Sequence, residues 1–127
     1  FGFSPAGATA EPWLPQPASW AGLTVEAQQS DPASMLWLYR QALRIRRAEA
    51  GLGDGPFTWL DAPEGVLAFA RGDRFVSVTN LSAVPVPLPD NTAILLSSSP
   101  LDDGLLPPDS TAWLRTQQRP PETSTTH

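Results

Sequence analysis

The chain has 127 residues, enough for one domain with a buried core, and a formal net charge of −5. This acidic balance argues against a nucleic-acid surface, which needs clustered basic residues. Cysteine is absent and the one histidine is the terminal His127, so disulfides, thiolate chemistry, Ser-His-Asp catalysis and His-ligated metal sites lack their essential side chains.

No apolar run approaches the roughly 18 residues that a membrane-spanning helix needs, and the first residues do not resemble a secretory signal. The chain opens on Phe1, and its one methionine, Met35, lies far inside, which favours a fragment of a longer protein. We therefore expect a cytoplasmic protein that binds neither membranes nor nucleic acid, with no cofactor and no metal-ligating residue in this chain.

Residues 1–19 carry four prolines and two glycines and show no sustained period, which predicts a long loop. Its aromatic side chains, Phe1, Phe3 and Trp13, favour an ordered loop that lies on another surface. A short helical turn is expected over residues 24–29.

The next segment predicts an amphipathic helix over residues 31–50. Asp31 can cap its start, and Pro32 suits the first helical position. Apolar residues recur at helical spacing through Met35, Leu36, Leu38, Tyr39, Ala42, Leu43 and Ile45. Gly51 and Gly53 would supply a left-handed end. Because the apolar sector is broad, this helix needs two neighbours, more than a small β module offers.

The remainder of the chain changes to a period of two, with turn residues between short runs, which predicts strands. Six runs are expected, over residues 56–61, 65–71, 74–82, 84–88, 93–98 and 111–115, with tight turns at 62–65 and 71–74. Pro85, Pro87 and Pro89 remove ladder donors, so the fourth run must lie at an edge. The strand spacing suggests a small antiparallel sandwich, with Trp59 and Trp113 in its core.

Only the 13 acidic residues remain as candidates for catalysis, and nearly all lie at expected caps, turns or the tail. Those in caps, turns and loops include Asp31, Asp54, Asp73, Asp102, Asp103 and Asp109. The glycines after residue 50 lack the following helix that a phosphate-binding loop needs, and no metal-ligand spacing is present. The chain by itself therefore predicts no catalytic residue. Its strand tryptophans could stack on sugars, but core packing is the favoured interpretation.

Four segments resemble the C-terminal portion of bacterial α-glucosidases: PWLPQPASWAGLTVEAQQSDPASMLWLYRQALRIRR, FTWLDAPEGVLAFAR, FVSVTNLS and LPPDSTAWL. Those enzymes, of the oligo-1,6-glucosidase and maltase type, belong to glycoside hydrolase family 13, the α-amylase clan. The resemblance covers about residues 1 to 115. It rests on ordered signatures: the VEAQ…DP.S helix, the VLAFAR strand, the Asn-Leu-Ser strand end and the PPD…WL terminus.

The resemblance implies a mixed fold, the last helix of a (β/α)8 barrel followed by a small antiparallel β-sandwich called domain C. Residues 1–52 would end the catalytic barrel, residues 53–119 would form domain C, and residues 120–127 would be a disordered tail. The family's catalytic carboxylates have no matching position in this sequence. Phe1 and Phe3, in the loop after the eighth strand, would line the rim of the sugar pocket in the intact enzyme.

The expected function is that of a C-terminal, non-catalytic segment of a retaining α-glucosidase, which completes and stabilises the barrel. The intact protein would be a glycoside hydrolase acting on maltose- or isomaltose-like oligosaccharides, and this chain alone would be inactive. Its partners would be these α-glucosides, through the intact enzyme, and the rest of the barrel. Two alternatives stay open: a free-standing β-sandwich carbohydrate-binding module, and a scaffold or interaction domain.

Overall fold

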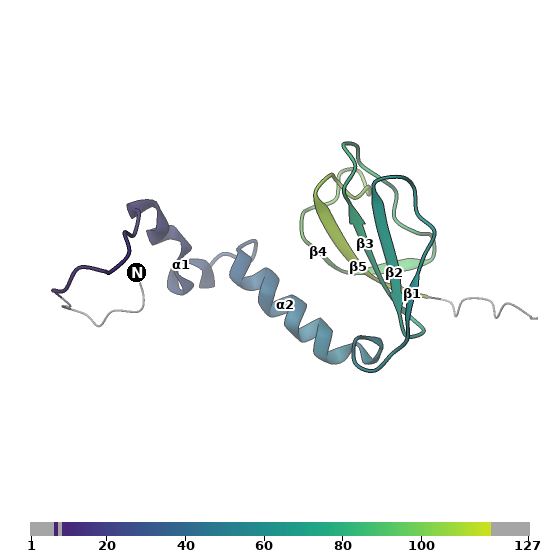
Figure 1. Cartoon of the computed structure of the whole chain (residues 1–127), viewed down its shortest axis with the longest axis horizontal. Coiled ribbons are helices and arrows are strands. Elements are labelled where there is room, and N and C mark those ends of the chain that lie inside the picture. The colour runs from purple at the N-terminus through teal and green to yellow at the C-terminus, as the bar shows by residue number, and fades with distance from the viewer. Residues whose placement is uncertain (1–6, 8, 118–127) are drawn as a thin grey trace, which may run out of the picture. The chain divides into compact units, whose positions relative to one another are not determined.

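The computed structural model describes residue 7 and residues 9–117. Phe1, Phe3 and the expected tail at residues 120–127 lie outside this part. The chain divides into two compact units, one up to Leu43 and one from Arg44 onward, whose α-helices and strands are labelled in Figure 1. Within residues 9–117, no helix combines the length and hydropathy needed to cross a membrane.

The first unit is helical. It contains the 3-10 helix η1 (Ala18–Leu23), the short helix α1 (Val25–Gln29) and the first part of α2 (Met35–Ala48), which continues into the second unit. The Thr24 hydroxyl caps α1 by accepting a hydrogen bond from the Ala27 amide (3.2 Å). The short helical turn expected over residues 24–29 is confirmed.

The side chain of Gln28 forms hydrogen bonds that connect α1 to α2. Its side-chain amide donates to the Leu23 carbonyl (2.6 Å), and its side-chain oxygen accepts from the Leu36 amide (3.0 Å). The hydroxyl of the buried Ser34 donates to the Gln28 carbonyl (3.0 Å). Polar residues of the VEAQ…DP.S signature thus satisfy the backbone groups that two helix ends leave without partners.

Helix α2 begins later than the sequence predicts, at Met35 rather than at residue 31. The Asp31 carboxylate accepts from the Ala33 amide (3.0 Å), which closes a turn on its own backbone instead of capping the helix. The first carbonyl to receive a helical i+4 bond is that of Ser34, from the Leu38 amide (3.1 Å). The expected cap is therefore displaced by about one turn.

The end of α2 also differs from the expectation. A short 3-10 helix, η2 (Ala50–Leu52), follows it, and the Gly53 amide donates to the Ala50 carbonyl (3.1 Å). Neither Gly51 nor Gly53 has a positive φ, so the expected left-handed end is wrong. The 3-10 turn satisfies the helix end in its place.

One antiparallel sheet forms the second unit. Its strands are β1 (Phe57–Trp59), β2 (Val66–Arg71), β3 (Phe75–Asn80), β4 (Thr92–Ser97) and β5 (Ser110–Thr116), in the order β1-β2-β3-β5-β4. Gly65 and Gly72 have positive φ values of 77° and 60° in the turns that flank β2, a conformation that strains other residues. The antiparallel β module following a helix, and both predicted turns, are confirmed.

The proline-rich run at residues 84–88 does not form a strand. It contributes one bridge, in which Val86 and Leu106 exchange backbone hydrogen bonds of 3.0 and 2.8 Å. Three alternating prolines deprive this run of the amide donors that a longer ladder requires. The expected sandwich therefore has no second full sheet. Its second layer is the run at residues 84–88, which we call the covering segment.

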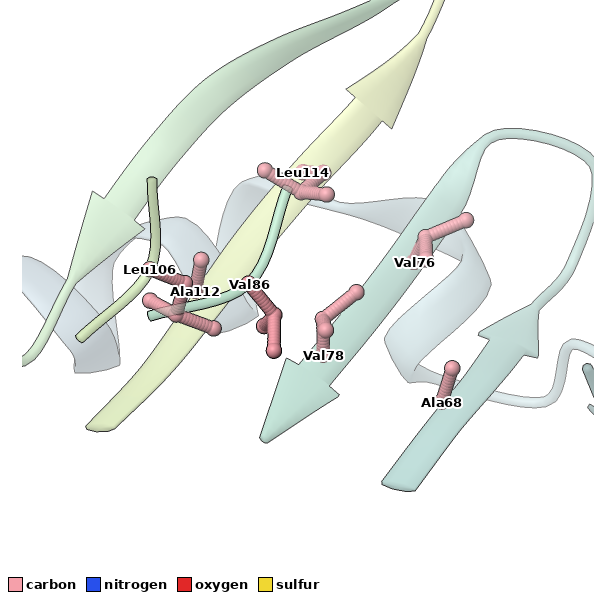
Figure 2. Close-up of a cluster of buried hydrophobic side chains, with 7 residues drawn as sticks. All are labelled: Ala68, Val76, Val78, Val86, Leu106, Ala112 and Leu114. Carbon is pink, nitrogen blue, oxygen red and sulfur yellow. The ribbon is translucent and has the colours of Figure 1, made fainter. Parts of the chain in front are cut away.

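This segment covers the apolar core of the second unit, shown in Figure 2. Apolar side chains from β2, β3 and β5 meet Val86 and Leu106 there. The strand residues are Ala68, Val76, Val78, Ala112 and Leu114. Leu106 and Leu114 are completely buried, and each such side chain contributes about 1.5–3 kcal/mol relative to exposure. The second unit thus has a core of its own.

Candidate functional site

The acidic side chains with defined contacts act structurally. Asp31 closes a turn, and Glu49 forms an ion pair with Arg115. Over the part of the chain that the structure describes, no group of three or more His, Asp or Glu side chains is arranged to hold a metal ion. The two expected pocket-rim residues, Phe1 and Phe3, precede the described residues. Three other features remain: a packed joint, an aromatic cluster and a helix surface.

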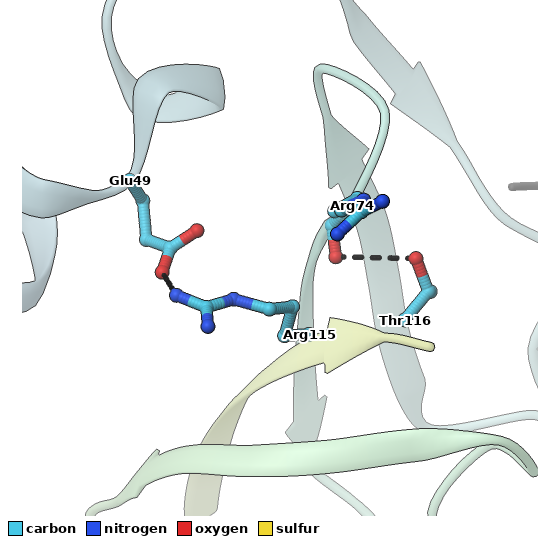
Figure 3. Close-up of polar contacts among 4 residues, drawn as sticks. All are labelled: Glu49, Arg74, Arg115 and Thr116. Carbon is cyan, nitrogen blue, oxygen red and sulfur yellow. Dashed lines mark hydrogen bonds and ion pairs between the residues drawn. The ribbon is translucent and has the colours of Figure 1, made fainter. Parts of the chain in front are cut away.

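The Glu49–Arg115 ion pair joins the exit of α2 to β5 (Figure 3). The Glu49 side chain is largely buried, whereas Arg115 is about half exposed. At the same end of the sheet, the Thr116 amide donates to the Arg74 carbonyl (2.8 Å). Because the Glu49 carboxylate is committed to a cationic partner, we assign it a positioning role in this joint rather than a chemical one.

Close backbone contact is the second part of the joint. A Cβ on Gly51 would overlap the Arg71 carbonyl oxygen, and a Cβ on Gly72 would lie 2.8 Å from the Gly51 Cα. The Arg71 guanidinium donates from Nε to the Gly55 carbonyl (3.2 Å) and from Nη2 to the Gly53 carbonyl (2.9 Å). These glycines therefore allow two backbones to touch, a role that a sequence pattern does not reveal.

An open cavity of about 400 Å³ lies beside this joint. Its lining mixes glycine backbone with the charged residues Glu49, Asp73 and Arg74. Ligand sites are mostly enclosed and apolar, with a few convergent polar groups, and this cavity does not have that character. We assign it no ligand.

Aromatic rings gather on β1 and β2. The ring centroids of Phe57 and Trp59 lie 4.9 Å apart, those of Phe57 and Phe69 5.1 Å, and those of Trp59 and Phe69 6.1 Å. Trp59 is 64% exposed, so the expectation that it packs in the core is wrong for this chain. Trp113 is half-buried and contacts Phe75 edge to face at 5.6 Å. Alternation along a strand indicates which face of the sheet a residue lies on, but it does not indicate which segment covers that face.

The apolar surface of α2 is also uncovered. None of its residues is buried, and Met35, Tyr39 and Leu43 are all exposed. Their spacing of four residues places them in one row along the helix. The broad apolar sector that the sequence predicts is therefore present, and nothing in the described part of the chain buries it.

Parts of this chain are similar to known proteins in sequence and in structure. No protein-family model matches the chain. It is 32% identical over 77 residues to a glucan 1,6-alpha-glucosidase of Streptococcus pneumoniae serotype 4, covering 58% of this chain and 14% of that protein. It is 37% identical over 63 residues to a probable alpha-glucosidase of Rhizobium meliloti, covering 50% of this chain and 11% of that protein.

Solved structures match a longer part of this chain than these two relatives do. The trehalulose synthase MutB is similar with a TM-score of 0.68 and 25% identity, over 85% of this chain and 22% of that one. An isomaltulose synthase from Klebsiella has a TM-score of 0.67 at 19% identity, a likeness of fold alone. The chain spans less than a quarter of the length of these proteins and relatives. The resemblance to glycoside hydrolase family 13, the α-amylase clan, is thus confirmed: the chain is similar in sequence to α-glucosidases, and in fold to part of larger enzymes of that clan.

Proposed function

We propose that this chain is the C-terminal, non-catalytic segment of a cytoplasmic, retaining α-glucosidase, and that it completes and stabilises the catalytic barrel. Residues 1–52 end the barrel and residues 53–119 form domain C. The observation that carries this proposal is the structural match, which takes in 85% of this chain but only 22% of a trehalulose synthase. A segment of this size and fold is one part of a larger α-glucoside-acting enzyme.

The uncovered surface of α2 supports the stabilising role. Met35, Tyr39 and Leu43 form an apolar row on a helix that has no buried residue. Burying such side chains contributes about 1.5–3 kcal/mol each, so a helix with this surface gains much of its stability from a partner. In this proposal α2 is the last helix of the barrel, and the partner is the rest of that barrel.

The chemistry belongs to the remainder of the enzyme. A retaining glycosidase uses two carboxyl groups about 5–5.5 Å apart, one as nucleophile and one as acid and base. Barrel enzymes carry such groups at the ends of several strands. The present segment supplies none of them and acts on maltose- or isomaltose-like oligosaccharides only through the intact enzyme.

The 127-residue chain is therefore expected to release no nitrophenol from p-nitrophenyl α-glucoside, while the full-length polypeptide that contains it releases nitrophenol and retains the α configuration in its products. Time-resolved absorbance and NMR of the released sugar measure the two properties. Heat-inactivated full-length protein is the control. Turnover by the purified 127-residue chain, or no turnover by the full-length polypeptide on any α-glucoside, would contradict the proposal.

Phe1 and Phe3 are proposed to line the rim of the sugar pocket, because barrel loops after the strands build the active face. Phe3→Ala in the full-length enzyme is expected to change kcat/KM by about tenfold for at least one disaccharide, the effect of losing about 1.4 kcal/mol of transition-state binding. The test compares maltose, isomaltose and trehalose. An unchanged kcat/KM on all three would remove Phe3 from the pocket.

A further inference from the structure

The dipeptide Asp-Gly occurs twice in the chain, as Asp54-Gly55 and as Asp103-Gly104, and both copies lie in the second unit. In this dipeptide the glycine amide nitrogen can attack the side-chain carboxyl carbon of the aspartate, because glycine has no side chain to hinder the approach. The attack closes a cyclic imide. The sequence offers this chemistry equally at both copies, so the surrounding structure decides between them.

Asp103 and Gly104 form the exposed tip of a two-residue hairpin. Asp102 and Leu105 exchange backbone hydrogen bonds of 2.9 and 2.8 Å around them. Asp103 and Gly104 have φ values of 47° and 84°, the pair of left-handed conformations that a type I′ turn requires. Within the described part of the chain, nothing accepts a hydrogen bond from the Gly104 amide, so the attacking nitrogen is not engaged.

The space around this tip is open. A Cβ added to Gly104 would meet no described atom within 4 Å, and both tip residues are exposed. Rotation of the Asp103 backbone, which brings the carboxyl carbon to the Gly104 nitrogen, therefore displaces no packed neighbour.

The other copy of the dipeptide is held in place. The Arg71 guanidinium donates to the Gly53 carbonyl (2.9 Å) and to the Gly55 carbonyl (3.2 Å), and so fixes the backbone on both sides of Asp54. A Cβ on Gly55 would lie only 2.5 Å from the Gly51 carbonyl oxygen, so the chain here is packed against backbone. Closing the imide requires rotation of the Asp54 backbone, which these contacts oppose.

We propose that Asp103 is a site of spontaneous backbone modification, at which aspartate converts to isoaspartate, and that Asp54 is protected from it. The Gly104 nitrogen loses its proton and bonds to the Asp103 Cγ, while one Cγ–O bond breaks and water leaves. Water then cleaves the imide. Breaking the bond from nitrogen to Cγ restores aspartate, and breaking the bond from nitrogen to the backbone carbonyl carbon gives isoaspartate. One water leaves and one enters, so no other reactant is needed.

The modification falls beside a core contact. Isoaspartate lengthens the backbone by one carbon, within the turn that Asp102 and Leu105 close. The next residue, Leu106, is completely buried and exchanges backbone hydrogen bonds with Val86 of the covering segment, and both side chains are shown in Figure 2. Conversion at Asp103 thus alters the backbone close to the cover of the core. This inference is independent of the proposed function.

Peptide mapping of the full-length polypeptide tests the proposal. The protein is incubated native and, in parallel, unfolded in guanidinium chloride, and electron-transfer mass spectrometry then distinguishes isoaspartate from aspartate. In the native protein we expect at least about tenfold more isoaspartate at Asp103 than at Asp54, a barrier difference of about 1.4 kcal/mol. In the unfolded protein we expect comparable amounts, because the Arg71 contacts are lost. Equal amounts in the native protein would overturn the proposal. The same tenfold preference in the unfolded protein would overturn it too, since local sequence would then decide.

Paired variants provide a second readout. Asp103→Asn makes the same imide by releasing ammonia, a better leaving group than water from a carboxylate, and suits the same turn. In the native full-length polypeptide we expect it to lose its amide at least about tenfold faster than Asp54→Asn, the matched control at the held copy. Equal rates of ammonia release from the two native variants would contradict the proposal.

Discussion

Replacing Gly72 with alanine is expected to lower the free energy of unfolding of the second unit by about 2–4 kcal/mol. Two effects add. Gly72 has a φ of +60°, where an alanine costs roughly 1–2 kcal/mol. Its new Cβ would also lie 2.8 Å from the Gly51 Cα, and backbone cannot move aside without a rearrangement that costs about 1–3 kcal/mol. The smaller entropy of the unfolded alanine chain returns only about 0.4–1 kcal/mol.

Two other glycines separate these effects. Gly51→Ala introduces only the clash, against the Arg71 carbonyl, because Gly51 has no positive φ. Gly104→Ala introduces only the conformational strain, because Gly104 has a φ of +84° and a Cβ added there would meet no described atom within 4 Å. We expect Gly51→Ala to cost about 1–3 kcal/mol and Gly104→Ala about 1 kcal/mol.

Urea titration followed by circular dichroism measures all three variants. If Gly72→Ala proves no more destabilising than Gly104→Ala, the two backbones do not touch at the joint. If Gly51→Ala also lowers the free energy of unfolding, while Gly104→Ala costs no more than the expected amount, the glycines at the joint are needed for close backbone contact rather than for flexibility.

Asn80→Asp is expected to cost about 3–5 kcal/mol, because it places an unpaired charge in a fully buried position. The Asn80 amide nitrogen donates to two carbonyls, those of Val84 (2.8 Å) and Leu106 (3.0 Å). Its oxygen accepts from the backbone amide and the hydroxyl of Ser82, at 2.9 and 2.7 Å. A carboxylate at this position still accepts both hydrogen bonds from Ser82. Its other oxygen, however, faces the Val84 and Leu106 carbonyl oxygens with no donor between them.

Asn91→Asp is the matched control, since it makes the same chemical change at an exposed turn residue. Asn91 has a φ of 56°, which aspartate tolerates nearly as well as asparagine, so we expect a change within about 0.5 kcal/mol. Differential scanning calorimetry of both variants provides the comparison. Similar midpoints for the two variants would show that Asn80 does not tie β3 to the covering segment.

The Asn80 contacts also explain one of the sequence signatures, the Asn-Leu-Ser strand end. The Asn-Leu-Ser strand end reads as a β-to-turn transition, and the structure shows why its two polar residues are asparagine and serine. Asn80 donates to Val84 of the run at residues 84–88 and to Leu106, 26 residues away along the chain, and so joins β3 to that run and to the residue that pairs with Val86. Ser82 supplies the donors that hold the Asn80 oxygen in place.

Local patterns were sufficient for the kinds of element and their order. Apolar spacing predicted α2, and alternation with turn residues predicted β1 to β5 and both turns around β2, because each of these depends on neighbours within a few residues. The start of α2 was placed too early because an aspartate can close its own turn as readily as it caps a helix. The proline-rich run became a single bridge because its missing donors cannot sustain a ladder.

The sequence by itself determined the family resemblance, the helical and antiparallel parts and the lack of cysteine and of an internal histidine, since all of these are local or compositional properties. Only the tertiary structure decided what the glycines after α2 do, where Asn80 finds its partners and that Trp59 faces outward. Each of these depends on a contact, or on the absence of a cover, between residues far apart in the chain. A one-dimensional pattern specifies which face a side chain belongs to, but the packing of distant segments decides what that face meets.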